Sequence, residues 1–403
     1  MTAIAEPLPL PQFKGQPGWE FTDLKGLDLD AYVPAEGGDE SAVERVEELF
    51  PGLEAARRLT QVDGIGLATP GAALPDGVIV KPLELAAREH PELVEAHLGR
   101  VVTREDAFTT RNRALYRGGA FVYVPRGVAV EDPIVLSAVQ DAAGSAMHWR
   151  VLVVLEEGSQ AEIWEQYLSG SEDTDGLFTT VVELVVGQNA NLRFVSGQAL
   201  SEKSWIFGSQ RAEVQRDANL DWVALGFGTK RGKLFQETKL AGPGSTGKVT
   251  GAYATRGRQH VDFDTLQEHA APDTVSDLAF RGVLGGRSSA VWRGMIQVDE
   301  GAQKTDAFQE SRNLLLSDKA HADAIPGLEI EANDVRCTHA AAIAQIDPEQ
   351  LFYLHSRGVP TEQANRLVIE GFLSELVSRF EEGPVRDTLA AALEKRLELV
   401  LSS

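Results

Sequence analysis

The middle of the chain carries the hydrophobic pattern of short β-strands. From about residue 120 onward, runs of β-branched and aromatic residues alternate with Gly, Asn and Asp. Such runs lie at residues 151–155, 180–186, 192–195, 248–253 and 290–298. Over the same stretch the sequence lacks long segments with apolar residues at helical spacing. The pattern therefore predicts an all-β region.

The β region also repeats itself. A polar turn, a small residue and, two positions later, an apolar residue recur at Ala161, Ala190 and Ala218, which are 29 and 28 residues apart. Further steps of 28 residues reach positions 246, 274 and 302, each in a turn followed by a strand-like run. A steady period of this size is typical of stacked rungs, so it predicts a β-solenoid. A sandwich whose strands happen to be evenly spaced is the alternative.

Helical patterns flank the β region on both sides. We expect three parts: an N-terminal helical region at 1–100, a β-helix core at 101–346 and a C-terminal helical domain at 347–403. In the last part, Asp347 with Pro348 is typical of a helix start, and Thr361 can cap a second helix. A third helix is expected from about residue 385 to 401. The second helix carries an apolar stripe, formed by Leu367, Phe372, Leu376 and Phe380.

The composition is that of an ordinary globular protein with a strong negative charge. The chain has 403 residues, and 38 basic against 60 acidic side chains give a net charge of −22. A body this acidic repels nucleic-acid phosphates and anionic lipids, so neither is expected as the main partner. No apolar run approaches the roughly 18 residues of a membrane span. Glu6 and three prolines interrupt the opening segment, so no signal peptide and a cytoplasmic location are expected.

Residues 242–248 form a glycine-rich segment that looks like a phosphate-binding loop. Such a loop places Ser or Thr after its lysine to hold magnesium, but Lys248 is followed by Val249. A strand rather than a helix is expected next, so the helix N-terminus that binds phosphate is missing. We therefore expect a turn between rungs here and no nucleotide bound by this chain.

A second candidate is a row of metal-type ligands on one strand. His260, Asp262 and Asp264 alternate along the sequence and would share one face of a strand. Such a set can bind a metal ion, but it also fits a solvated strand face with Val261 and Phe263 inward. Paired carboxylates on a β-helix would alternatively suit a carbohydrate-active enzyme, with Asp262, Asp264 and Glu268 as its candidates.

The single cysteine lies in the most informative stretch. Cys337 and His339 are two positions apart, so on a strand a thiol and an imidazole point the same way. The pair suits iron, zinc or the edge of an iron–sulfur cluster. A buried cysteine beside a surface histidine is the plain structural alternative. One cysteine allows neither an internal disulfide nor a four-cysteine metal site, so other ligands would come from elsewhere.

Residues 333–342, which contain this pair, and residues 345–359 carry a long and specific motif. Shorter matching segments lie at residues 19–24, 294–298, 314–317 and 326–330. Together they closely resemble the signature of the SufB/SufD family, subunits of the SUF iron–sulfur cluster assembly machinery. The Cys-x-His order resembles the SufD form. SufB instead resembles Glu-His-Glu-Ala, and its proposed ligand glutamate falls where this chain has Ala340, a position that is usually glycine in SufD.

The resemblance implies a right-handed parallel β-helix with helical flanks, in a complex with SufB and the ATPase SufC. It implies that a transient iron–sulfur cluster or iron is shared with SufB at their interface, with His339 as the first and Cys337 as the second candidate ligand. It also implies that the C-terminal helices dock SufC, through Leu367, Phe372, Leu376 and Phe380. No catalytic residue and no turnover of its own are then expected. A purely architectural role beside SufB stays open, as does a homodimer of the isolated chain through the same strand edge.

Overall fold

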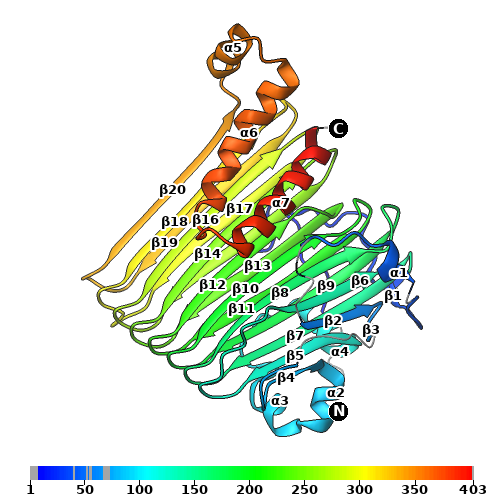
Figure 1. Ribbon diagram of the computed structural model, residues 1–403, viewed down its shortest axis with the longest axis vertical. Coiled ribbons are helices and arrows are strands. Elements are labelled where there is room, and N and C mark those ends of the chain that lie inside the picture. Colours follow the sequence, from blue (N-terminus) through cyan, green and yellow to red (C-terminus); the bar gives the residue numbers. More distant parts are fainter. Residues whose placement is uncertain (1–7, 40, 51–52, 54–56, 67–72, 402–403) are drawn as a thin grey trace.

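The computed structural model describes residues 8–39, 41–50, 53, 57–66 and 73–401. Most of the opening segment considered for a signal peptide lies outside these residues. The body of the molecule is a parallel β-solenoid, whose chain winds back and forth between two facing sheets (Figure 1). This confirms the fold class that the 28-residue repeat predicts.

Both sheets have 10 strands. The first contains, in spatial order, β19 (His321–Ile330), β17 (Ser289–Val298), β15 (His260–His269), β13 (Arg231–Leu240), β11 (Trp205–Val214), β9 (Gly176–Val186), β7 (Ser145–Leu155), β5 (Gly118–Val124) and β4 (Ile79–Pro82), with β1 (Val33–Pro34) beside β7. The second contains β20 (Arg336–Gln345), β18 (Asp306–Leu315), β16 (Val275–Leu284), β14 (Thr246–Thr255), β12 (Asn219–Gly226), β10 (Asn191–Ala199), β8 (Gln160–Ser169), β6 (Ile134–Gln140), β2 (Arg57–Val62) and β3 (Ile65–Gly66). Only the β2–β3 and β4–β5 pairs are antiparallel among the described strands.

A two-residue device precedes every strand from β8 to β18 in the second sheet. A residue with a left-handed backbone comes first, and a small, fully buried residue follows it. The left-handed residues are Gly158, Asn189, Asp217, Gly244, Asp273 and Lys304. The buried residues are Ser159, Ala190, Ala218, Ser245, Thr274 and Thr305. Gly, Asn and Asp tolerate this backbone best, and a hydroxyl at the second position can bond back to the turn, as Ser245 Oγ does to Gly242 O at 2.7 Å.

This device is the repeat seen in the sequence, with a variable step. Ala190, Ala218 and Thr274 occupy equivalent places in their rungs, as the 28-residue step predicts. The other equivalents are displaced from the predicted positions 161, 246 and 302, and are Ser159, Ser245 and Thr305. Paired strand positions lie 31 residues apart from Gln160 to Asn191 but 27 apart from Asn219 to Thr246. Corner loops of different length therefore make a fixed step lose register.

Two C-terminal helices cover the outer face of the second sheet. α6 (Thr361–Val377) and α7 (Pro384–Leu401) lie across its strands (Figure 1). Leu373 and Leu393 join a buried apolar cluster with Val223 and Val283 of the sheet. α5 (Pro348–Ser356) has no buried residue and stands away from the body beyond β20 (Figure 1). These helices begin and end close to the predicted positions.

The N-terminal part is not purely helical, as the sequence analysis expected. It contains α1 (Ala42–Arg45), α2 (Leu83–Glu89) and α3 (Pro91–His97), with α4 (Ala107–Leu115) after them, but also strands β1 to β4, which extend the two sheets. Before these elements, Trp19 packs on the rings of Phe108, Phe207 and Phe235 over the outer face of the first sheet. No helix in the described part of the chain is long and apolar enough to cross a membrane.

The two ends of the solenoid differ. At the N-terminal end, the antiparallel strands β3 and β4 finish the two sheets. At the C-terminal end, β19 and β20 are the last strands, and in the described chain each pairs on one side only. The solenoid is therefore open at the end that carries Cys337 and His339.

Candidate functional site

Cys337 and His339 lie on β20, the free edge of the second sheet. In the β18–β20 register, Cys337 is paired with Ala307 and His339 with Gln309. Ala307 and Gln309 are fully buried inside the solenoid, so the two side chains continue inward-facing rows. No further rung of the described chain covers them, and His339 is exposed while Cys337 is half-buried.

The environment of Cys337 favours the protonated thiol. The side chain packs beside Val335 and against Ile296 and Val298. Burial, followed by the nearby carboxylate of Asp306, raises the pKa of the thiol. Because the thiolate is the form that binds metals, Cys337 is the weaker of the two candidate ligands in the isolated chain.

Gln309 forms the floor beneath His339. Its Nε2 atom donates to the carbonyl oxygens of Gly294 at 3.2 Å and Gly327 at 3.0 Å, and so bridges the two sheets. The sequence analysis missed this residue, because only the strand register reveals that it lies next to His339. On the opposite sheet, Leu328 and Ile330 of β19 are exposed at the open end. A thiol, an imidazole and apolar side chains thus share one unfinished rung.

Two side chains are too few to hold a cluster. Cys337 and His339 contribute one sulfur and one imidazole, and the described residues contain no group of three or more His, Cys, Asp or Glu side chains that could hold a metal ion. An iron–sulfur cluster generally takes four ligands. A cluster at this edge would therefore need ligands from a second protein.

The row of His260, Asp262 and Asp264 is a buried ion-pair cluster rather than a metal site or a solvated face. The three residues do share one face of β15, with Val261 and Phe263 in the inner core. Lys233 Nζ lies 2.8 Å from Asp262 and 3.6 Å from Asp264, and so neutralises both carboxylates.

Thr22 closes this row from the N-terminal segment. Its Oγ1 donates to Asp262 at 2.6 Å and lies 3.1 Å from His260 Nε2. The other imidazole nitrogen is 2.8 Å from Ser289 Oγ. Burial lowers the pKa of His260 to about 4, so the ring is neutral. All four groups are satisfied within the protein.

The carboxylates proposed for a carbohydrate-active enzyme are likewise engaged. Glu268 lies 2.5 Å from Arg211 and 2.7 Å from Lys239, and these cations lower its pKa against the effect of burial. Asp262 is only 2% exposed. A glycosidase needs a general acid that reaches its substrate, and these buried ion pairs do not support that hypothesis.

Residues 242–248 form the corner between β13 and β14. Gly244 is the left-handed residue of the repeated turn device. Lys248 Nζ donates to the carbonyl of Arg379, just beyond the end of α6, at 2.6 Å and lies over the Phe380 ring. The resemblance to a phosphate-binding loop thus comes from a structural turn and a lysine that binds a helix end.

The apolar stripe on α6 is divided between two environments. Leu376 and Phe380 are buried in the cluster against the second sheet, whereas Leu367 is 45% exposed and Phe372 is half-buried. Only the first half of the stripe is therefore available at the surface for a partner.

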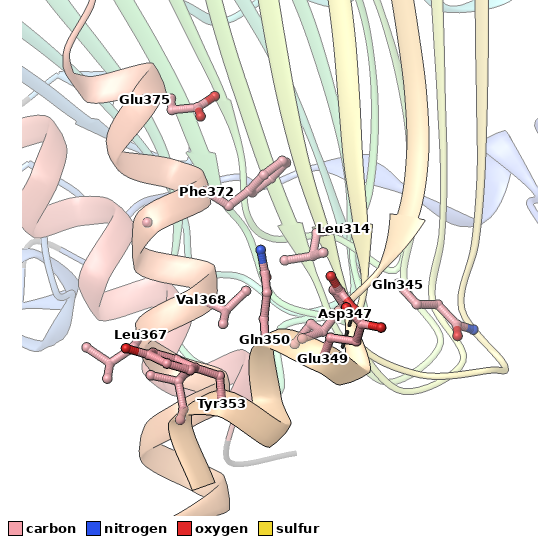
Figure 2. Close-up of a pocket in the computed structure, with 13 residues that line it drawn as sticks. Leu314, Gln345, Asp347, Glu349, Gln350, Tyr353, Leu367, Val368, Phe372 and Glu375 are labelled. Carbon is pink, nitrogen blue, oxygen red and sulfur yellow. Dashed lines mark hydrogen bonds between the residues drawn. The ribbon is translucent and has the colours of Figure 1, made fainter. Parts of the chain in front are cut away.

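Leu367 and Phe372 line a groove of about 870 Å³ between α5, α6 and the end of β20 (Figure 2). Tyr353, Val368 and Leu314 complete its apolar walls. These three residues were missed, because they come from three different elements whose proximity no sequence spacing reveals. The lining also contains carboxylates, from Asp347, Glu349 and Glu375.

An ion-pair network ties this groove to the strands beside β20. Arg281 of β16 contacts Glu310 of β18 at 2.6 Å and Glu375 of α6 at 3.4 Å. Arg312 contacts the same two carboxylates, at 3.2 Å and 3.8 Å. Since β20 leads directly into Asp347, which caps α5, the groove and the open edge share one structural frame.

The fold and the open rung define a parallel β-solenoid that is built to be completed by another protein. Residues 138–372 match the family model for the SufBD core domain of SUF system FeS cluster assembly, and residues 65–136 match the SufBD protein N-terminal region. The chain belongs to the SufB/SufD family.

Known relatives support the same assignment. The chain is 35% identical to the iron–sulfur cluster assembly protein SufD of Bacillus subtilis, over 80% of this chain and 74% of that protein. It is 30% identical to an iron–sulfur cluster assembly SufBD family protein of Mycobacterium tuberculosis, over 94% of this chain and 93% of the relative. The chain is thus a homologue of SufD.

Proposed function

We propose that this chain is the SufD-type subunit of a SUF scaffold and joins a SufB-type partner end to end through β19 and β20. Unpaired backbone groups along two strand edges can each accept a further strand. Exposed Leu328, Ile330 and Ile343 surround the open rung. A partner solenoid would bury these apolar side chains and complete the hydrogen bonds of both sheets.

We further propose that His339 is an iron or cluster ligand at this junction and that Cys337 supports it. The observation that carries this proposal is the inward direction of both side chains on an exposed edge strand. Once a partner covers the edge, they would lie in an enclosed space between two rungs. The cluster is cargo held transiently with the partner, and the chain needs no turnover of its own.

The groove beside α5 and α6 is the proposed docking site for a SufC-type ATPase. Exposed Phe352, Tyr353 and Leu367 are large apolar side chains that the body of the molecule does not cover. Because the ion pairs of Arg281 and Arg312 connect α6 to β16 and β18, movement of the helices by a bound ATPase would be transmitted toward β20.

The test of the cluster site uses the complex formed with SufB-type and SufC-type partners, purified without oxygen. His339→Ala should leave the complex intact while bound iron and sulfide fall about tenfold or more, because a direct ligand is lost. Cys337→Ser should cause a smaller loss. Thr338→Ala is the matched control, since Thr338 is an exposed neighbour on the opposite face of β20.

Two results would contradict the cluster role. Full iron and sulfide content in the His339→Ala complex would leave the chain as an architectural partner only. An equal loss in Thr338→Ala would show that the strand edge, rather than the imidazole, is what matters. A retained cluster with a missing SufC-type subunit would separate the two parts of the proposal.

The docking groove is tested by Leu367→Asp, which places a charge among the apolar walls. Binding of the SufC-type ATPase, measured by calorimetry, should weaken about tenfold or more, with no change in SufB-type binding. Leu399→Asp is the control, because Leu399 is similarly exposed on α7 but lies outside this groove. Equal affinities of wild type and Leu367→Asp would reject the groove as the docking site.

A further inference from the structure

A second cavity lies where both flanks of the chain meet one corner of the solenoid. Its volume is about 530 Å³. The walls come from residues following α1, from the corner loops after β8, β10, β12 and β14, and from one side of α7. None of the residues around His339 or in the α5–α6 groove takes part in it.

Arg396 of α7 is the buried charge of this cavity, with 8% of its surface exposed. Its Nε atom donates to the carbonyl of Ala254 and its Nη2 atom to Gln259 Oε1, both at 2.8 Å. These acceptors are neutral, and in the described chain the guanidinium has no carboxylate within ion-pair distance and no hydrogen bond from Nη1. Burial lowers the pKa of Arg396 to about 10. A buried cation without a counter-charge is unusual, because desolvation of a charge is costly.

Three more cations line the cavity and are only weakly committed. Each forms an ion pair of 2.5 Å near the surface; the pairs are Lys203–Asp173, Arg256–Glu202 and Lys395–Glu47. Surface pairs of this kind contribute little free energy, so the cations can turn toward a bound anion. The lining as a whole holds five basic and five acidic side chains, which makes it less acidic than the rest of this strongly negative chain.

We propose that this cavity binds a small oxyanion, whose phosphate or carboxylate group lies against Arg396. The guanidinium is held in place by two neutral hydrogen bonds and keeps donors free for a ligand, and its planar fork matches such groups. Lys203, Arg256 and Lys395 provide further contacts. The volume suits a molecule of metabolite size. A bound anion would tie α7 and the segment after α1 to the solenoid corner.

The test is calorimetry and thermal unfolding of the full chain with inorganic phosphate, pyrophosphate and citrate at constant ionic strength. At least one of these anions should bind saturably and raise the melting temperature, and the three arms separate phosphate from carboxylate ligands. Arg396→Gln should weaken binding about tenfold or more, since a charge-assisted contact is lost. Arg366→Gln, which removes an exposed cation of α6, should bind like wild type.

A double variant, Lys203→Gln with Lys395→Gln, keeps the test decisive if Arg396→Gln does not fold, because both lysines are at the surface. It should weaken binding of the same anion several-fold. Absence of saturable binding of all three anions to the wild-type chain would overturn the proposal. Unchanged affinity in the folded Arg396→Gln variant, or in the double variant, would overturn it as well.

Discussion

Glu165 is a carboxylate that lies completely inside the solenoid. Trp149 Nε1, Tyr167 OH and Ser196 Oγ donate hydrogen bonds to it at 2.8, 2.7 and 3.1 Å. Burial nevertheless raises the pKa of Glu165 to about 7. These neutral donors offset only part of the cost of removing a charge from water.

This residue should make the free energy of unfolding depend on pH. The unfolded carboxyl titrates near 4.5 and the folded one near 7, so its stabilising contribution is complete below pH 4.5 and is lost as the pH rises through 7. The loss amounts to about 3 kcal/mol. Glu165→Gln, which cannot ionise, should remove this decline in urea unfolding curves between pH 5 and pH 8.

Glu157→Gln is the control for this experiment, because Glu157 is an exposed turn residue paired with Arg126. Its pH profile should follow that of the wild-type chain. Parallel profiles for Glu165→Gln and wild type would mean that the interior accommodates the ionised carboxylate without cost.

At the scale of the element, Lys304 is the exception in the turn device. The other left-handed positions before these strands are Gly, Asn or Asp, whereas Lys304 adopts φ 60° with an exposed side chain. A residue with a Cβ atom pays about 1 kcal/mol for this backbone. Lys304→Gly should therefore raise the free energy of unfolding by up to about 1 kcal/mol in urea titrations.

Lys319→Gly provides the contrast, since Lys319 lies in another surface turn without a left-handed backbone. That variant should be neutral or lose about 0.5–1 kcal/mol, because glycine is more flexible in the unfolded chain. A loss of stability in Lys304→Gly similar to that in Lys319→Gly would argue against strain at Lys304.

Elements with local signals could be predicted from the sequence. Asp347 and Pro348 mark the start of α5, and the recurring turn followed by a small residue marks the rungs. β2 and β4 were not predicted, because they are strands only by pairing with distant segments, β2 with β6 and β4 with β5. Their own short sequences have no distinctive period.

The candidate site was predictable to a similar degree. Alternation along a strand correctly places Cys337 and His339 on one side. It also placed His260 and Asp262 together, but could not show that Thr22, 238 and 240 residues away, would reach them. Long-range closure of a polar row depends on tertiary packing, which local spacing does not encode.

For the whole molecule, the open end predicts self-association of the isolated chain. Two strand edges with exposed Ile330 and Ile343 are a surface on which a second copy can dock. Sedimentation of the purified chain should give a dimer, and Ile343→Lys should shift it to monomers, because a lysine on the edge resists burial.

Ile65→Lys is the matched control, since Ile65 has nearly the same exposure but lies on β3 at the opposite end of the solenoid. It should remain dimeric. A monomeric wild-type chain at micromolar concentration, or monomers from Ile65→Lys, would contradict an interface formed by β19 and β20.

The unfinished rung has a consequence for how much of this protein a cell can make. A surplus of the chain over its partner would leave bare strand edges, and the only complementary surface in abundance would then be another copy of the same chain. Each such pairing would withdraw two subunits from assembly. Matched synthesis of the two partners, or prompt removal of the surplus, is therefore a requirement set by the shape of the fold itself.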